Sequence, residues 1–269
     1  MIGVHVDISD KQSNFDDLLK FHKLGIIQLF VNSKFKYYDK LSLFLKQNNI
    51  KAVVHASYTI NLASDWSEYS WNIKQFIEEI ELASKINAIG IVVHMGKQLD
   101  LSIEKAYNNM YTGLLHVHNQ TKKYQNIKII LETSTGQGSE ICFKIEDLIY
   151  FFSKFINHPN KEINDRFRLC LDTCHIFSAG YDLRDKKNID KYINLINKKI
   201  GFKYIALIHL NDSKRGLGEN VDRHENIGDG CIGKSGLVYF ANIFKKLNIP
   251  IILETPYEKN NDELKLLNK

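Results

Sequence analysis

Several short apolar runs along this chain end on a side chain that can bind a metal ion. Imidazole and carboxylate groups are the ligands that suit zinc and other divalent transition metals. Six consecutive runs end in this way, which predicts metal-dependent chemistry where the ends of these runs meet. The residues that end them are His55, His94, Glu132, Asp172, His209 and Glu254.

Three further residues extend this set. His175 follows Asp172 by three positions, and Asp222 and His224 lie on a long loop after the His209 run. A single histidine at a strand end is more often a structural residue or a single catalytic base than a metal ligand. Burying several converging charged side chains without a cation, however, would cost several kcal/mol of folding free energy for each unpaired charge. Nine candidates exceed what one four-coordinate ion uses, so two or three ions are predicted. The histidines without this placement, expected to be structural or on the surface, are His5, His22, His116, His118 and His158.

The apolar runs have the length and composition of buried strands. They are apolar and β-branched nearly end to end, which is typical of parallel strands covered on both faces. Stretches with helical periodicity separate them along the whole chain. The predicted strands are Ile2–Val6, Ile26–Phe30, Lys51–Ala56, Ile89–His94, Ile127–Glu132, Arg168–Asp172, Tyr204–His209 and Ile249–Glu254. The predicted helical stretches are Phe15–Phe21, Lys40–Leu45, Trp71–Ile86, Ala106–Val117, Ile145–Phe155, Tyr192–Ile200 and Leu237–Leu247.

This alternation predicts an α/β fold of the TIM (β/α)8 barrel type, because eight such units in 269 residues match the size of that fold. An open doubly wound sheet is the alternative. Barrel enzymes carry their working residues at or just past the carboxyl ends of the strands, where the candidate ligands stand.

No Gly-, Pro- or Ser-rich linker interrupts the chain, so residues 1–269 are expected to form one domain. The stretch Lys214–Gly236 is rich in glycine and charge, and we expect a functional loop there.

Composition and charge exclude several classes of protein. With 44% hydrophobic and 25% charged residues, the chain can bury a large core without disulfides. It has no apolar run long enough to span a membrane and no secretory signal pattern at its start, so an intracellular location is expected. The net charge of +5 permits a polyanionic partner without requiring one. No nucleophile elbow, Walker loop or dinucleotide-binding motif competes with the metal-ligand pattern.

Two cysteines, Cys170 and Cys174, bracket Asp172 and could be mistaken for a thiolate zinc site. On a strand Cys170 and Asp172 share a face, whereas Cys174 lies beyond the strand end, and no second cysteine pair completes a thiolate set. We therefore expect two buried thiols. A disulfide between them would require a sharp backbone turn.

Three segments resemble the signature segments of the endonuclease IV family of apurinic/apyrimidinic endonucleases. They are His55–Ala63, Arg168–His175, and His209–Lys214 with its continuation through Asp222–His224. Glu132–Ser139 and Leu253–Pro256 are also similar to the family, so the resemblance runs in register over nearly the full chain. It implies a monomeric TIM barrel with three zinc ions that cleaves the phosphodiester 5′ of an abasic site in duplex DNA. The products would be a 3′-hydroxyl and a 5′-deoxyribose phosphate, and trimming of blocked 3′ ends is a further implied activity.

The resemblance also implies how the nine ligands divide among the ions. Glu132 would bridge two ions and, as the catalytic residue, would orient the attacking hydroxide. A bridged metal pair lowers the pKa of a shared water from 15.7 toward about 7, so no protein nucleophile is needed. The three implied ligand sets are His55, His94 and Glu132; Glu132, Asp172, His209 and Glu254; and His175, Asp222 and His224.

Contacts to DNA are expected from loops at the barrel mouth, because an abasic sugar must leave the helix to reach a recessed metal cluster. Relatives carry an Arg in the loop after the second strand and a bulky aliphatic residue after the Tyr of the next loop, where this chain has Phe35 and Thr59. Phe35 and Tyr58 are therefore the expected wedges, with ordinary surface aromatics as the alternative. Arg223 could instead be structural. The expected DNA contacts are Lys34, Phe35, Lys36, Tyr58, Thr59, Lys214, Arg215 and Arg223.

Two other functions compete with the nuclease. A xylose-isomerase-like sugar isomerase or epimerase also uses Glu, Asp and His at strand ends, but it needs only one or two ions and has no use for Asp222 and His224. A DNA-binding barrel without catalysis has no physical reason to keep nine converging ligands.

Overall fold

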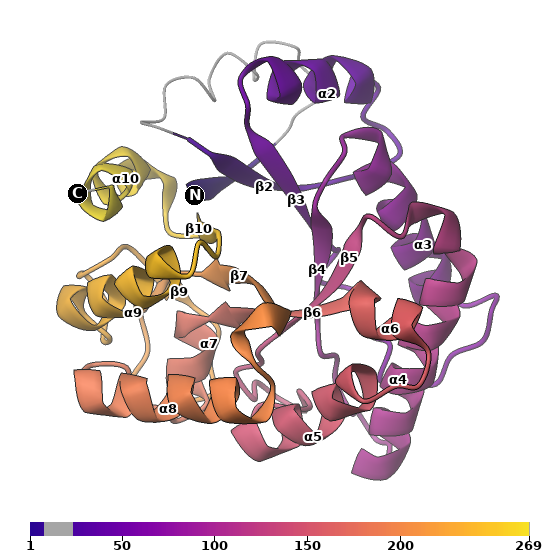
Figure 1. Ribbon diagram of the computed structural model, residues 1–269. Helices are drawn as coiled ribbons and strands as arrows, with labels where there is room; N and C mark the ends of the chain where they lie inside the picture. Colours follow the sequence, from indigo (N-terminus) through magenta and orange to yellow (C-terminus); the bar gives the residue numbers. More distant parts are fainter. Residues whose placement is uncertain (8–23, 269) are drawn as a thin grey trace.

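Parallel strands close into a barrel wrapped by helices in the computed structural model, which describes residues 1–7 and 24–268 (Figure 1). The strand order is β1-β10-β7-β6-β5-β4-β3-β2, and β1 pairs with both β2 and β10, which closes the sheet. The predicted barrel is confirmed and the open sheet is excluded. The barrel strands are β1 (Ile2–Val6), β2 (Ile26–Phe30), β3 (Lys51–His55), β4 (Gly90–His94), β5 (Lys128–Glu132), β6 (Phe167–Asp172), β7 (Ile205–His209) and β10 (Ile251–Leu253).

Helices cover the outside of the barrel, and those predicted within the described residues are present. The stretch predicted at 15–21 lies outside the described residues. Three helices, α6, α7 and α10, were not predicted, because six to eight residues are too few to show a clear helical period. The α-helices are α2 (Tyr38–Gln47), α3 (Trp71–Lys85), α4 (Ile103–Gln120), α5 (Ile145–Ile156), α6 (Lys161–Arg166), α7 (Thr173–Ser178), α8 (Lys186–Lys199), α9 (Lys234–Lys246) and α10 (Asn260–Leu267). Short 3-10 turns occupy Lys122–Tyr124, Phe202–Tyr204 and Tyr257–Lys259.

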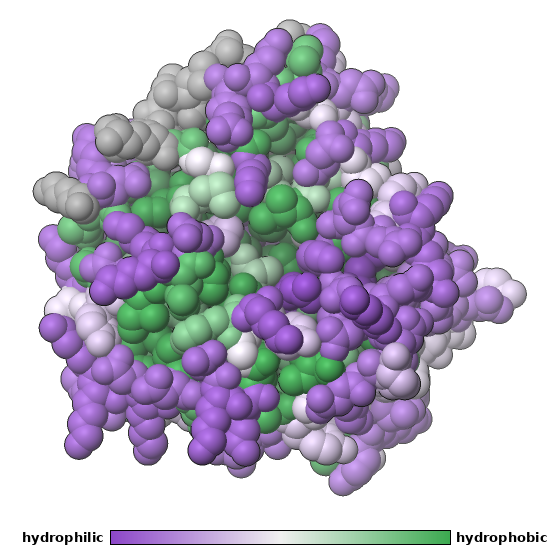
Figure 2. All heavy atoms as spheres, in the orientation of Figure 1, coloured by the Kyte–Doolittle hydropathy of each residue, from purple (hydrophilic) through white to green (hydrophobic). Residues whose placement is uncertain are grey.

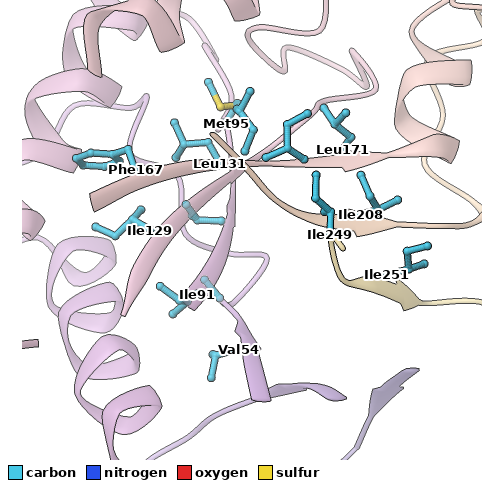
Figure 3. Close-up of a cluster of buried hydrophobic side chains, with 14 of the residues drawn as sticks. Val54, Ile91, Met95, Ile129, Leu131, Phe167, Leu171, Ile208, Ile249 and Ile251 are labelled. Atoms are coloured by element: carbon cyan, nitrogen blue, oxygen red, sulfur yellow. The ribbon is translucent and has the colours of Figure 1, made fainter. Parts of the chain in front are cut away.

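The core has two parts, because alternate residues of each strand face the inside and the outside of the barrel. On β5, Ile129 and Leu131 pack in the outer core between sheet and helices (Figure 3). Ile130, between them, lies in the inner core. On the face in Figure 2, hydrophilic side chains gather at the periphery and hydrophobic ones toward the middle. The inner core consists of Ile26, Val53, Val92, Ile130, Cys170, Leu207 and Ile252.

Gly3 occupies the corresponding position on β1. A Cβ atom there would lie 1.6 Å from the backbone oxygen of Ile26, so no side chain fits between β1 and β2 at this level. The barrel strands thus supply one inner layer that is apolar apart from the Cys170 thiol.

The loop predicted to be functional carries a small second sheet. Strand β8 (Asp212–Ser213) pairs antiparallel with β9 (His224–Glu225). This pairing brings His224 back toward the end of β7. Within the described part of the chain, no helix combines the length and hydropathy that a membrane span requires.

Candidate metal centre

A polar layer stands directly above the apolar inner layer. On each barrel strand the next inward-facing residue is two positions further along, and at the strand ends these residues include the predicted ligands. The layer also contains His5 and Gln28, which sequence reasoning did not place there. The sequence did carry a signal for both residues: His5 comes two positions after Gly3, and Gln28 comes two positions after Ile26, so each faces the inside of the barrel. The members of the layer are His5, Gln28, His55, His94, Glu132, Asp172, His209 and Glu254.

Glu132 lies at the centre of the predicted ligands and is 1% exposed. Its Oε2 is 3.4 Å from His55 Nε2 and 3.1 Å from His94 Nε2. Its Oε1 is 2.6 Å from His209 Nδ1. The two carboxylate oxygens therefore face different groups of ligands, which is the arrangement that a bridging carboxylate requires.

The second group gathers around His209. The Nδ1 atom of His209 is 3.1 Å from Glu254 Oε2 and 3.8 Å from Asp172 Oδ2. Asn211 donates from Nδ2 to Asp172 Oδ2 at 2.6 Å, which orients that carboxylate. Asn211 is a supporting residue that sequence reasoning did not single out.

The third group combines a helix start with the long loop. Asp172 caps α7 and accepts from the backbone N–H of His175 at 2.9 Å, which places His175 in the first turn, above the strand end. Asp222 Oδ1 is 3.3 Å from His175 Nε2 and 3.1 Å from His224 Nε2. These two imidazole nitrogens are buried without a hydrogen-bond partner. His175 Nε2 and His224 Nε2 therefore face the Asp222 carboxylate without making a hydrogen bond, and a cation bound between these three groups would satisfy them.

The structure thus brings the nine predicted ligands into three adjoining groups. Ligand atoms within each group lie within 4.8 Å of one another. Five imidazoles and four carboxylates form a nitrogen and oxygen donor set of the kind that zinc accepts. The groups are His55, His94 and Glu132; Glu132, Asp172, His209 and Glu254; and His175, Asp222 and His224.

The second ring nitrogen of several histidines is held by a hydrogen bond. His55 Nδ1 lies 2.7 Å from the backbone oxygen of Ala56, and His175 Nδ1 lies 2.7 Å from that of Thr133. Since these nitrogens donate to carbonyl oxygens, the Nε2 atoms face the carboxylates and are the atoms that would bind a metal ion. Such outer hydrogen bonds are the usual means by which a protein orients metal-binding histidines.

The electrostatics of the site favour bound positive charge. Burial by itself would raise the pKa of Glu132, but the charge of His209 and hydrogen bonds from three histidines hold it well below its usual value. Burial would lower the pKa of His224, but the carboxylates of Asp172 and Asp222 raise it to about 9. Burial would also lower the pKa of His209, but the neighbouring Cys170 thiol and the carboxylates of Glu254 and Glu132 raise it. Protons balance the carboxylates in the metal-free chain, and divalent cations can replace them.

The long loop is organised by the buried carboxylate of Asp212. Asp212 Oδ1 accepts from the backbone N–H groups of Ser213 at 2.8 Å and Ile232 at 2.9 Å, and its Oδ2 accepts from Gly228 at 2.9 Å. Gly233 N–H also points at this carboxylate. One side chain therefore ties both ends of the segment that carries Asp222 and His224.

Among the expected DNA contacts, Phe35 is a correction. Its ring is 4% exposed and packs edge-on against Tyr38, so it belongs to the outer core and is not a surface wedge. A large aromatic ring gains more from burial beside α2 than from exposure to water. Tyr58, by contrast, is 62% exposed, and its ring stands 5.0 Å from that of His55 and 5.4 Å from that of His94.

The remaining expected contacts are all exposed. Lys214 Nζ lies 3.7 Å from Glu225 Oε2, and Arg223 Nη1 donates to the backbone oxygen of Asp222. The Arg223 bond ties this side chain to the loop that carries the third group. The exposed members of the set are Lys34, Lys36, Tyr58, Thr59, Lys214, Arg215 and Arg223.

The two cysteines beside Asp172 are buried free thiols, as predicted. Burial raises the pKa of Cys170 and Cys174 to about 12, so both remain protonated at neutral pH. Each thiol also lies within 4.8 Å of two of the predicted ligands: Cys170 near Glu132 and His209, and Cys174 near Asp172 and His224.

Comparison with known proteins agrees with this geometry. Residues 19–268 match the family of xylose isomerase-like TIM barrels. A putative endonuclease 4 from Acanthamoeba polyphaga mimivirus is 34% identical over 278 residues, covering 97% of this chain and 87% of the relative. The crystal structure of endonuclease IV from Thermus thermophilus superposes with a TM-score of 0.82 at 22% identity, covering 99% of this chain and 97% of that one. A D-tagatose 3-epimerase-like protein superposes with a TM-score of 0.77 at 16% identity over 99% of this chain and 95% of that one, so the fold alone does not separate the two activities. By the sequence match to its endonuclease 4 relatives over most of the chain, this protein belongs to the endonuclease IV family within the xylose isomerase-like TIM barrels.

Proposed function

We propose that this chain is a zinc-dependent endonuclease that hydrolyses the phosphodiester 5′ of an abasic site in duplex DNA. The observation that carries the proposal is the set of nine ligands in three adjoining groups that meet at Glu132 and Asp172. Membership of the endonuclease IV family supports a DNA substrate. We also propose a monomer and the trimming of blocked 3′ ends as a second activity.

The proposed ligands have distinct tasks. His55 and His94 would hold one ion with Glu132, the His209 group a second, and His175, Asp222 and His224 the third. Zinc ions bound there supply a Lewis acid that lowers the pKa of water toward about 7 and neutralises charge on the phosphate and the leaving oxygen.

Glu132 would orient the attacking hydroxide. In the metal-free chain neighbouring histidines hold the pKa of Glu132 well below the usual value, and bound cations in their place would likewise keep the carboxylate ionised. Near-complete burial keeps competing solvent away from it. A fixed carboxylate of this kind can accept a hydrogen bond from water and orient its lone pair toward the phosphorus.

Tyr58 and the basic loop residues are proposed to bind the substrate. The Tyr58 ring is exposed beside His55 and His94, where a flipped-out sugar would enter the site. Lys214, Arg215 and Arg223 lie on the loop that also carries the third group, so phosphate contacts there would align the backbone with the metal centre.

The sugar epimerase is the second candidate, and one observation disfavours it. The group formed by His175, Asp222 and His224 depends on the long loop and lies beyond what a site with one or two ions uses. A phosphodiester with a charged leaving oxygen has a use for the third ion, whereas proton transfer on a sugar does not.

The test uses a 5′-labelled duplex with one tetrahydrofuran abasic analogue, which cannot undergo β-elimination. Wild-type protein is expected to produce an incision whose 3′ end a polymerase extends, and His94→Ala is expected to abolish it. His116→Ala, which changes a helical histidine whose ring lies tilted against Trp66, is the matched control and should cut normally. No incision by fully zinc-loaded protein would reject the nuclease, and binding without incision would favour a silent binding module.

A further inference from the structure

Gln28 is fully buried in the polar layer, where its amide contacts two of the proposed ligands. We propose that Gln28 is a positioning residue that fixes the tautomer of His209 and the orientation of Glu254 toward one zinc ion. This inference rests on the proposed zinc centre.

The amide reaches both ligands at short distances. Gln28 Oε1 lies 2.8 Å from His209 Nε2, and Gln28 Nε2 donates to Glu254 Oε1 at 2.6 Å. A flipped amide would point its oxygen at the Glu254 carboxylate and its N–H group at His209, so charge decides the orientation. His209 Nε2 therefore donates to Gln28.

The orientation of the Gln28 amide also decides which atoms of His209 and Glu254 face the proposed zinc ion. With Nε2 donating to Gln28, His209 turns Nδ1 toward Glu132 and Glu254, so an ion bound between them would meet the Nδ1 lone pair once the Nδ1 proton has left. With its Oε1 engaged by Gln28, Glu254 presents Oε2 to the same place, 3.1 Å from His209 Nδ1. The Gln28 amide thus turns His209 Nδ1 and Glu254 Oε2 toward the same point, where an ion would bind.

His5 completes the arrangement from the neighbouring strand. Its Nδ1 is 3.1 Å from Gln28 Nε2 and accepts the second N–H of the amide. The register pairs His5 with Gln28 across β1 and β2, so the two side chains stand side by side on the inner face. Both donors and the acceptor of Gln28 are then used, which leaves the amide no second orientation.

Gln28 differs from the other supports of the histidine ligands. The second nitrogens of His55, His175 and His224 lie near backbone oxygens, which no substitution removes. The support of His209 is a side chain and can be deleted. An apolar residue at position 28 would leave His209 Nε2 and Glu254 Oε1 buried with their Gln28 partner removed, and each would be free to turn away.

The experiment compares zinc retention in Gln28→Met with that in the wild type. Methionine has a similar length and no hydrogen-bonding amide. Zinc-loaded protein is titrated with a chromogenic chelator, and the ions released are counted. One ion is expected to be held about 10- to 100-fold more weakly in the variant, while the others leave at the wild-type chelator concentration.

Ile26→Val is the matched control, because Ile26 lies on the same strand and face, two residues earlier, and belongs to the apolar inner core. It should release zinc as the wild type does. Gln28→Glu keeps an oxygen that accepts from His209 and, when protonated, a donor toward Glu254, so it is expected to restore part of the affinity and also serves if the methionine variant fails to fold.

Several results would overturn the inference: wild-type retention of every ion in Gln28→Met, equal release in Ile26→Val, or no recovery in Gln28→Glu. A wild-type protein that binds no zinc would instead overturn the proposed function, so the two failures are distinguishable.

Discussion

Glu132 Oε1 lies 2.6 Å from His209 Nδ1, although the two residues are 77 positions apart in the chain. They come from β5 and β7, with β6 between them in the barrel. The contact between Glu132 and His209 joins the ligand group of His55 and His94 to the group of Asp172 and Glu254. Changes at this junction and in the loops around it should therefore affect metal binding, stability and DNA cleavage in different ways.

Glu132→Gln keeps the size of the side chain and removes its charge. We expect incision of abasic DNA to fall by about 10²-fold or more, because a neutral amide neither bridges two cations nor accepts the proton of water. Zinc content by mass spectrometry should fall below the wild-type value. Glu79→Gln, at another buried glutamate outside the centre, is the control. Full activity of Glu132→Gln would refute its catalytic role.

Zinc binding should release protons in a pH-dependent manner. In the metal-free protein the pKa of His224 is about 9, against 6.5 for an ordinary histidine. At a pH of about 7.5 the incoming ion must displace that proton, whereas above a pH of about 9.5 His224 is already neutral. Calorimetric titration in buffers of different ionisation enthalpy should therefore show fewer protons released at the higher pH. Equal release at both pH values would contradict the raised pKa.

The same shift predicts how metal-free stability depends on pH. A raised folded pKa means that the folded state binds the His224 proton more tightly than the unfolded state. The stabilisation is fully present below pH 6.5 and is lost as the pH rises through about 9. Urea unfolding in chelator should show a falling free energy of unfolding across this range, and zinc-loaded protein should not show that fall.

Asp212→Ala should disconnect the long loop from the barrel. Losing the acceptor for several buried backbone N–H groups is expected to lower the free energy of unfolding by about 3 kcal/mol. The ion held by His175, Asp222 and His224 should be lost first. Asp229→Ala on the same loop removes an exposed pair with Lys259 and should change stability by less than about 0.5 kcal/mol. Similar behaviour of both variants would count against the organising role.

Two aromatic residues should respond in opposite ways. Tyr58→Ala is expected to weaken binding of abasic duplex about 10-fold with little change in melting temperature, since the ring is largely exposed. Phe35→Ala is expected to lower the free energy of unfolding by about 3 kcal/mol, since its ring is buried. Binding assays beside thermal melts separate the two effects. Tyr69→Ala, another exposed tyrosine between β3 and α3, is the control for Tyr58.

The barrel and most of its metal centre could be predicted from local sequence. Apolar runs that end on His55, His94, Glu132 and their counterparts carry both the strand signal and the ligand signal, because the same period of two residues governs burial and orientation. The parallel arrangement then brings the strand ends together without further information. Short helices such as α7 escaped prediction, since a single turn and a half has no period to detect.

Only the tertiary structure decided the rest. Gln28 and His5 became part of the centre because the closed barrel places β1 between β2 and β10, so that residues without a ligand pattern of their own face His209 and Glu254. Phe35 looked like a surface wedge in the sequence, yet packing against Tyr38 put it in the core. Local sequence determines which residues can bind metal or pack inside a barrel. Contacts between distant strands and loops determine which of them are oriented, buried or exposed, because these contacts exist only once the chain is closed.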